Sequence, residues 1–186
     1  MTPRLRTPRL VLRPPAADDV EAVFALYSDP EAMRHWSHPP WRSRAQAEAY
    51  LGTMRAAAAR GTVAVWLAEE GARAVGVATL WFLGDGRNAE VGYLLGRAHW
   101  GRGLASELLE AVLADGFGRR RLRHVDADVA AGNLRSLRLL ARLGFVPWAA
   151  RTRIAHDGSP VPGRVLRLEA DAFAAPPRAA APLGGV

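Results

Sequence analysis

The sequence predicts an α/β (α+β) fold, with a mixed, mostly antiparallel central sheet of about seven strands and about four helices on its faces. Three strand patterns follow one another between residues 63 and 95, and short glycine-bearing links join them, which is typical of an antiparallel meander. A glycine turn then leads into an amphipathic helix and another strand, as in a parallel βαβ crossover. A meander that feeds such a crossover produces a mixed sheet covered by helices.

The N-terminal third is predicted to contain one strand and two helices. Residues 9–13 (RLVLR) alternate charged and apolar side chains, which is the period of a half-buried strand. Asp18 precedes a run of apolar residues at helical spacing, which predicts a helix that ends before Pro30. Ser43 is a favourable N-cap for a second helix over residues 44–60.

The segment between these two helices combines prolines with aromatic rings, those of His35, Trp36, His38 and Trp41. Such a segment predicts a loop or a broken helix. His35 and His38 alone supply too few ligands for a metal ion, because protein zinc sites use three or four. We therefore predict no metal site.

The middle of the chain holds the meander and the crossover. The predicted meander strands cover residues 63–69, 74–83 and 89–95. Apolar residues then recur at helical spacing over residues 104–117, and residues 122–129 return as a strand.

The C-terminal part is predicted to add a short helix and a strand pair. Gly132 and Asn133 open the helix, and Gly144 ends it. Residues 145–154 and 165–168 then form the strands.

The chain has no internal repeat and no interdomain linker, so residues 1–173 are predicted to form a single domain. Proline, alanine and glycine dominate residues 174–186, which we expect to be a disordered tail.

The basic residues of this chain are all arginine. Its 186 residues include 25 basic and 18 acidic side chains, which gives a net charge of +7, and they include no cysteine. This composition excludes a lysine Schiff base, a P-loop lysine, a cysteine nucleophile and a cysteine metal site. The positive excess permits an anionic partner, but a coding bias toward arginine and alanine explains it as well. Because no segment has the apolar length of a signal peptide or a membrane span, we expect a cytoplasmic protein.

The stretch from residue 90 to residue 109 carries the most informative motif. Backbone amides and the dipole at the start of its helix suit a phosphate, and Gly101 and Gly103 let an anion approach the backbone. A P-loop is excluded because Arg102 and Gly103 stand where lysine and serine or threonine are required. A dinucleotide fingerprint is the weaker match, since Gly101, Gly103 and Ser106 follow an antiparallel meander.

A third phosphate-binding pattern fits better. Residues 100–105 (WGRGLA), followed by Ser106 and Glu107, resemble the acyl-CoA pyrophosphate loop of the GCN5-related N-acetyltransferases (GNAT). Trp100 stands where glutamine or arginine is usual, a departure typical of the branch that resembles the ribosomal-protein N-terminal acetyltransferases. Three further runs are similar to that branch and occur in its order: residues 7–13 (TPRLVLR), 90–93 (EVGY) and 133–145 (NLRS, then LGF).

This resemblance implies an acyl-CoA N-acyltransferase fold whose fourth and fifth strands splay apart. The free edge of the fourth strand would bind the pantetheine arm of acetyl-CoA, and amides of the glycine turn would bind its pyrophosphate. The implied cofactor-binding residues are Tyr93, Leu94, Leu95, Gly96, Gly101, Arg102, Gly103, Leu104, Ala105, Ser106, Asn133 and Ser136.

Acyl transfer to an amine requires two proton movements, and the sequence offers a candidate for each. By resemblance, Glu90 occupies the place of a proposed base, and a partly buried carboxylate suits that role. The last predicted helix has no tyrosine, which many relatives use as the acid, so Ser136 in its first turn is the candidate donor to the leaving thiolate. Two alternatives stay open: Glu90 as an ion-paired or substrate-orienting residue, and Ser136 as an ordinary helix-start serine.

The resemblance also places the aromatic segment beside the acceptor. His35, Trp36 and Trp41, together with Glu90, are therefore the predicted substrate-binding residues, although a hydrophobic plug over the sheet explains the aromatics equally well. Two arginine groups either meet the CoA 3′-phosphate or, as we favour, form solvated helix faces: residues 119–123, and Arg135, Arg138 and Arg142.

The resemblance implies an N-acetyltransferase that moves an acetyl group from acetyl-CoA to a primary amine by direct attack in a ternary complex. The acceptor is a protein N-terminus, such as that of a ribosomal protein, or a small-molecule amine. We expect no membrane and no specific nucleic-acid partner, and either a monomer or a homodimer. The alternative is a non-catalytic module on the same fold that senses acyl-CoA or contacts RNA.

Overall fold

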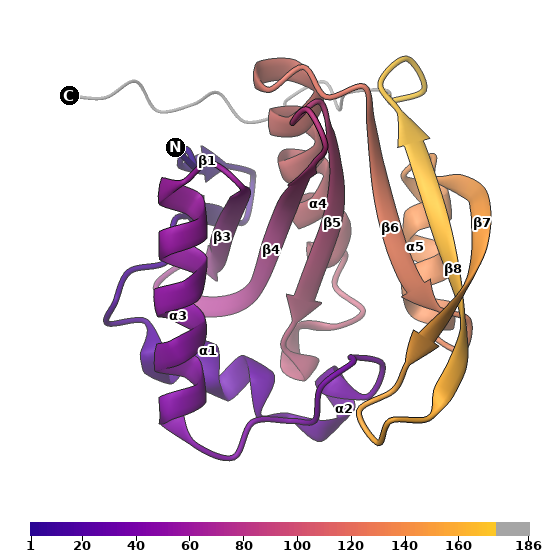
Figure 1. Ribbon diagram of the computed structural model, residues 1–186. Helices are drawn as coiled ribbons and strands as arrows, with labels where there is room; N and C mark the ends of the chain where they lie inside the picture. The colour runs from indigo at the N-terminus through magenta and orange to yellow at the C-terminus, as the bar shows by residue number, and fades with distance from the viewer. Residues whose placement is uncertain (174–186) are drawn as a thin grey trace.

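The computed structural model of this chain describes residues 1–173 and contains one eight-stranded sheet with helices on both faces (Figure 1). Its strands are β1 (Leu5–Arg6), β2 (Val11–Arg13), β3 (Val63–Glu70), β4 (Arg73–Leu83), β5 (Asn88–Leu95), β6 (His124–Ala130), β7 (Val146–Ile154) and β8 (Pro160–Glu169). The order across the sheet is β1-β2-β3-β4-β5-β6-β8-β7, and β5 and β6 form its parallel pair. The predicted mixed, mostly antiparallel sheet is confirmed, and the predicted tail lies outside the described residues.

The sheet has one strand more than predicted because the N-terminus folds back on itself. The predicted strand over residues 9–13 is shortened to β2, and β1 pairs with it as an antiparallel partner. Thr7 closes the turn between them, since its amide donates to the Leu10 carbonyl at 2.9 Å.

The helices follow the predicted order, with one short addition. They are α1 (Val20–Tyr27), α2 (Pro30–Met33), α3 (Arg44–Ala59), α4 (Leu104–Ala114) and α5 (Leu134–Arg142), with a 3₁₀ turn η1 (Arg97–His99) and a π turn η2 (Asp115–Arg119). The addition, α2, lies in the proline-rich segment, where the Asp29 side chain accepts from the amides of Glu31 and Ala32. Ser43 and Gln46 form a capping box at α3. Within residues 1–173, no helix is long and apolar enough to cross a membrane.

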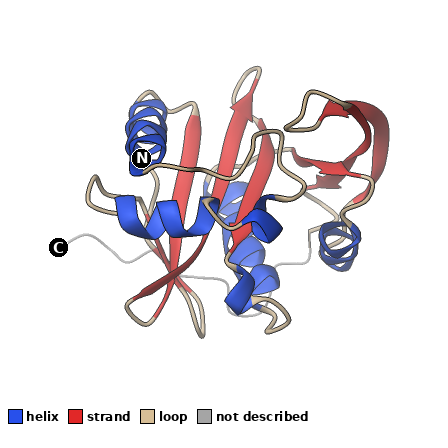
Figure 2. Cartoon of the chain, turned by 90° about the horizontal axis from the view of Figure 1, so that it is seen from below, coloured by secondary structure: helices blue, strands red, loops and turns tan. Residues whose placement is uncertain are grey.

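The helices divide into two layers, one on each face of the sheet (Figure 1 and Figure 2). Side chains alternate along a strand, so neighbouring residues of β3 belong to different cores. Val65 packs with Val23 of α1 and Leu51 of α3. Trp66 belongs to the larger core, with Leu108 of α4 and Leu140 of α5.

The strands β5 and β6 separate soon after they meet. Their register pairs join only residues 88–90 to residues 124–126. Beyond that point β5 stays paired with β4 as far as Leu95, and β6 stays paired with β8 as far as Ala130. The facing edges therefore carry backbone groups without a strand partner, and the predicted splay is confirmed.

Candidate active site

A cleft of about 1320 Å³ opens where β5 and β6 separate. Alternation along β5 places Val91 and Tyr93 on the face of α4 and α5, with the larger core. It places Glu90 on the opposite face, together with Leu94 of the smaller core. All four residues line the cleft, which therefore reaches both faces of the sheet.

The glycine turn forms one end of the cleft at the start of α4. Gly101 and Gly103 have φ angles of 74° and 76°, which side chains rarely tolerate. Within residues 1–173, no acceptor takes the amide hydrogens of residues 101–106. A Cβ at position 101 would meet no atom within 4 Å, so the backbone there is open to a ligand. These residues fit the pyrophosphate of a CoA thioester, because a phosphate accepts from several amides at a helix N-terminus.

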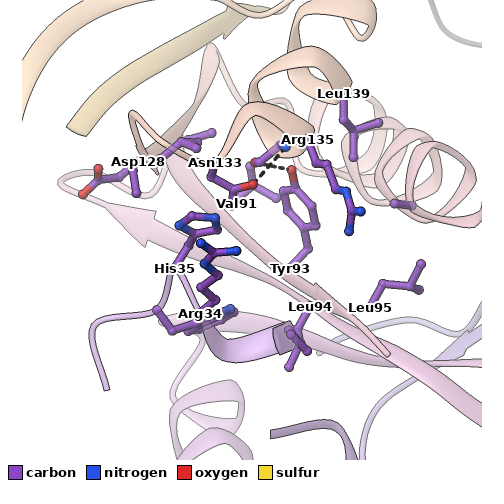
Figure 3. Close-up of a pocket in the computed structure, with 18 of the residues that line it drawn as sticks. Arg34, His35, Val91, Tyr93, Leu94, Leu95, Asp128, Asn133, Arg135 and Leu139 are labelled. Carbon is purple, nitrogen blue, oxygen red and sulfur yellow. Dashed lines mark hydrogen bonds between the residues drawn. The ribbon is translucent and has the colours of Figure 1, made fainter. Parts of the chain in front are cut away.

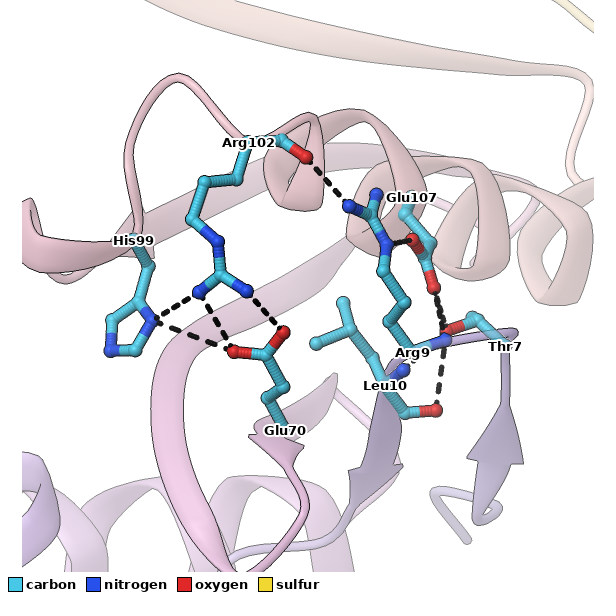
Figure 4. Close-up of polar contacts among 7 residues, drawn as sticks. All are labelled: Thr7, Arg9, Leu10, Glu70, His99, Arg102 and Glu107. Atoms are coloured by element: carbon cyan, nitrogen blue, oxygen red, sulfur yellow. Dashed lines mark hydrogen bonds and ion pairs between the residues drawn. The ribbon is translucent and has the colours of Figure 1, made fainter.

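Two ion pairs behind the turn hold it in place (Figure 4). The Arg102 guanidinium binds the Glu70 carboxylate at 2.6 and 2.9 Å. Arg9 binds the Glu107 carboxylate at 2.6 Å and also donates to the Arg102 carbonyl at 2.7 Å. The Arg102 side chain is committed to Glu70 and does not line the cleft, so the predicted cofactor contact of Arg102 stays a prediction about its backbone amide.

The two arginine groups differ in position. Arg119 and Arg120 each bind the buried Asp115 at 2.6 Å, at the opposite end of α4 from the glycine turn. The three arginines of α5, in contrast, line the cleft: Arg135, Arg138 and Arg142. Arg135 also lies over the Trp100 ring, 4.5 Å from its centre. Within residues 1–173, none of the α5 arginines forms an ion pair, so these are the candidates for an anionic cofactor.

Two hydroxyl groups meet between β5 and α5 (Figure 3). The Tyr93 hydroxyl lies 2.6 Å from the Ser136 Oγ. The Ser136 amide donates to the Asn133 side chain at 3.2 Å, which is the predicted helix cap. Burial raises the pKa of Tyr93 to about 12, so the phenol keeps its proton at neutral pH.

Sequence reasoning missed the side chain of Tyr93. The last predicted helix contains no tyrosine, and only backbone contacts were expected from the end of β5. The signal was the strand period, because Val91, Tyr93 and Leu95 share the face that packs against α4 and α5.

Glu90 lies on the other face of the cleft and is half-buried. Burial raises its pKa, and the neighbouring Asp128 adds to this, while Arg151 and Arg153 oppose it. Within residues 1–173 the Glu90 carboxylate has no hydrogen bond and no ion pair. It is therefore available to accept a proton.

The structure separates the predicted acceptor residues. His35 and Trp36 line the cleft together with Glu90. Trp41 does not line it, because its ring stacks on Tyr27 with the centres 4.3 Å apart. The interpretation of Trp41 as a packing residue fits this position better than substrate binding.

Within residues 1–173, His, Cys, Asp and Glu side chains form no group of three or more that could hold a metal ion.

Comparisons with known proteins agree with this geometry. A family model described as an acetyltransferase (GNAT) domain matches residues 9–146. The chain belongs to the GNAT acetyltransferase family. One relative is the uncharacterized N-acetyltransferase YoaA of Bacillus subtilis (strain 168), which is 33% identical over 148 residues. The matched region covers 78% of this chain and 84% of the relative. Another is the uncharacterized N-acetyltransferase p20 of Bacillus licheniformis, 29% identical over 144 residues, 76% of this chain and 81% of the relative.

Solved structures share the fold of this GNAT chain. A putative ribosomal-protein-serine acetyltransferase from Vibrio cholerae has a TM-score of 0.79 at 24% identity, with 91% of this chain and 99% of that chain covered. Mycobacterium smegmatis RimJ, solved in complex with CoA-disulfide, has a TM-score of 0.78 at 23% identity, with 92% and 91% covered. The predicted superfamily, fold and enzyme class are thus confirmed for this GNAT acetyltransferase, while the roles of single residues in its cleft stay predictions.

Proposed function

We propose that this GNAT protein transfers an acetyl group from acetyl-CoA to a primary amine by direct attack in a ternary complex. The observation that supports the proposal most strongly is the cleft between β5 and β6. It joins the glycine turn and the hydroxyl pair on one face of the sheet to an uncommitted carboxylate, Glu90, on the other. A donor and an acceptor can therefore approach from opposite faces and meet in the cleft.

The proposed donor is acetyl-CoA, which would supply the thioester and its leaving thiol. Backbone amides of residues 101–106 would hold the pyrophosphate. The edge of β5 over residues 93–96 would bind the arm, because β6 offers it no strand partner there. Asn133 would contact the arm beside Ser136. Two solved neighbours support this donor by their own ligands: RimJ with CoA-disulfide and the microcin C7 self-immunity acetyltransferase MccE with acetyl-CoA and AMP.

Glu90 is the proposed base. An amine attacks only in its neutral form, so the ammonium must first lose a proton. The raised pKa of Glu90 brings its basicity closer to that of the amine, and no partner in the described residues occupies the carboxylate. His35 and Trp36 would border the acceptor on the same side.

Ser136 is the proposed proton donor to the departing sulfur. The residue lines the cleft from the first turn of α5, and its hydrogen bond with Tyr93 gives it a second hydroxyl as neighbour. Tyr93 can donate to the Ser136 Oγ, which leaves the serine proton free to point into the cleft.

The wider proposal covers residues 1–173 as one domain in the cytoplasm, where acyl-CoA thioesters are made and used. The acceptor would be a protein N-terminus, including those of ribosomal proteins, or a small-molecule amine. A Vibrio cholerae neighbour described as a putative ribosomal-protein-serine acetyltransferase supports the first of these.

A substrate screen tests the proposed function. Purified protein is incubated with acetyl-CoA and a panel of amines that includes ribosomal N-terminal peptides, amino acids, polyamines and amine antibiotics. We expect thiol release that depends on one amine class, with the acetylated amine detected by mass spectrometry. Binding of acetyl-CoA without thiol release for any amine would contradict the proposal and favour a sensing module.

A further inference from the structure

Charged residues of both signs line the acceptor side of the cleft, and they differ in how far internal contacts commit them. The charged residues that line this side are Glu31, Glu90, Asp128, Arg34, Arg151 and Arg153. A ligand of this side should carry charges opposite to those of the side chains that no internal ion pair commits.

Asp128 and Arg153 neutralise each other. The Arg153 guanidinium lies 2.9 Å from the Asp128 carboxylate and 2.6 Å from the Asp128 carbonyl oxygen. Arg151 adds a longer contact of 3.3 Å to the same carboxylate. Both side chains of the shorter pair are largely buried, at 18% and 15% exposure, so this pair is fixed in place and offers little to a ligand.

Arg34 is positively charged and almost uncommitted. It follows the last residue of α2, and its guanidinium points into the cleft beside His35 (Figure 3). Its one acidic contact is Glu31 at 3.7 Å, between side chains that are 67% and 48% exposed. Such an exposed pair contributes little, so the guanidinium keeps its donors for a ligand.

Glu90 is the complementary uncommitted group, and the two lie around the same space. Both line the same cleft, Arg34 from the end of α2 and Glu90 from β5. Burial, followed by the charge of Arg34, lowers the pKa of His35, so the imidazole stays neutral and adds no charge of its own. One wall therefore offers a carboxylate and the other a guanidinium.

We propose that the acetyl acceptor carries a carboxylate close to its amine, and that Arg34 binds this carboxylate while the amine faces Glu90. The inference rests on the proposed function, since it names the acceptor class of the same site. A guanidinium binds a carboxylate through two parallel hydrogen bonds, which an amide or an ester cannot reproduce. Free α-amino acids and peptides with an acidic first residue both present this chemistry, whereas polyamines do not.

Matched acceptor pairs test the proposal. Each free amino acid is compared with its α-amide, and each peptide that begins with Asp or Glu is compared with the peptide that begins with Asn or Gln. kcat/KM is measured for the wild type, for Arg34→Gln and for Arg55→Gln. Arg55 is an exposed arginine of α3 that does not line the cleft, so its variant matches the change in net charge.

We expect the wild type to prefer the carboxylate member of one series by at least about 10-fold, the range of a hydrogen bond to a charged group. Arg34→Gln should remove this preference by raising KM for the carboxylate member, and Arg55→Gln should keep it. The series that shows the preference identifies the source of the carboxylate. Equal rates for acid and amide, or a preference that survives Arg34→Gln, would overturn the inference alone. Acetylation of an amine outside both series, with none inside them, would also overturn the inference and leave the proposed function standing. Failure of every amine in the wider panel would overturn the proposed function, and the inference with it.

Discussion

The phenol oxygen of Tyr93 lies 2.6 Å from the Oγ of Ser136, so β5 and α5 are joined by a hydroxyl pair at the point where β5 and β6 have separated. The two residues are 43 positions apart in the chain. Tyr93 is partly buried and keeps its proton at neutral pH, with a pKa of about 12. The pair therefore presents a proton to the cleft from the face opposite Glu90.

Loss of the hydroxyl pair should slow the chemical step. We expect Ser136→Ala to lower kcat by about 100-fold, the lower end of what a positioned proton donor contributes, with little change in the KM for acetyl-CoA. Tyr93→Phe should lower kcat by a smaller factor, because Ser136 remains. Steady-state rates of thiol release measure both.

The double variant shows whether the two hydroxyls act as one unit. Because they are in direct contact, Tyr93→Phe with Ser136→Ala should be no slower than Ser136→Ala alone. If the loss of kcat in the double variant equals the product of the two single losses, Tyr93 acts independently of Ser136. Tyr50→Phe is the control for stability, since it removes the hydroxyl of another partly buried tyrosine, which lies 3.1 Å from the Tyr27 hydroxyl. Its change in free energy of unfolding shows how much of the Tyr93→Phe effect is structural.

Glu90 should make both the stability and the activity change over the same pH range, in opposite directions. Its pKa is raised in the folded state, first by burial and then by Asp128, so the folded protein binds a proton at a pH where the unfolded chain has released it. Stability should therefore fall as pH rises from the ordinary glutamate pKa through the raised one. Activity should rise through the upper part of this window as the base ionises. Glu90→Gln should abolish both changes, which chemical denaturation and rate profiles between pH 4 and pH 8 can follow.

The glycine turn offers a matched test of cofactor binding. Gly103 and Gly61 share a φ angle of 76°, so an alanine is strained to a similar degree at both. Gly103 lies in the turn, whereas Gly61 follows α3 and does not line the cleft. We expect Gly103→Ala to weaken acetyl-CoA binding by at least about 10-fold, equal to about 1.4 kcal/mol, and Gly61→Ala to leave it unchanged. If calorimetry gave Gly103→Ala the same dissociation constant for acetyl-CoA as the wild type, the turn amides would have no role in binding.

Glu107 should stabilise the turn from behind. Burial alone would raise its pKa, but hydrogen bonds from Thr7 and Arg9 outweigh this and hold the pKa below its usual range. Glu107→Gln should cost about 2 kcal/mol of stability at pH 7, the range for hydrogen bonds to a charged group. Because the folded pKa is lowered, this contribution should be lost as pH falls through it, so the wild type and the variant should converge in acid denaturation. A difference that persists at low pH would contradict the assignment.

The sequence predicted the parts of the site that depend on local patterns. The glycine turn, the Asn133 cap and the strand–turn–helix order follow from spacing within one segment, and each has its predicted place. The splay of β5 and β6 came from family resemblance. It depends on β4 and β8 as competing neighbours, which spacing within β5 does not encode.

Local patterns did not predict the contacts between distant segments. Arg102 binds Glu70, 32 residues away, because β3 ends beside the turn, and this takes its side chain out of the cleft. Trp41 stacks on Tyr27 because the chain folds back along α1, with the Trp41 amide donating to the Tyr27 carbonyl at 2.9 Å. No periodicity within either segment predicts such a partner.

The most direct test of direct transfer between two bound substrates is an initial-rate study in which acetyl-CoA and the amine are varied together. If Glu90 and the hydroxyl pair act on both substrates within one cleft, thiol release should require the amine, and the reciprocal plots should intersect. Parallel plots, which indicate an acetylated protein intermediate, would contradict the account. So would a complete absence of thiol release with every amine.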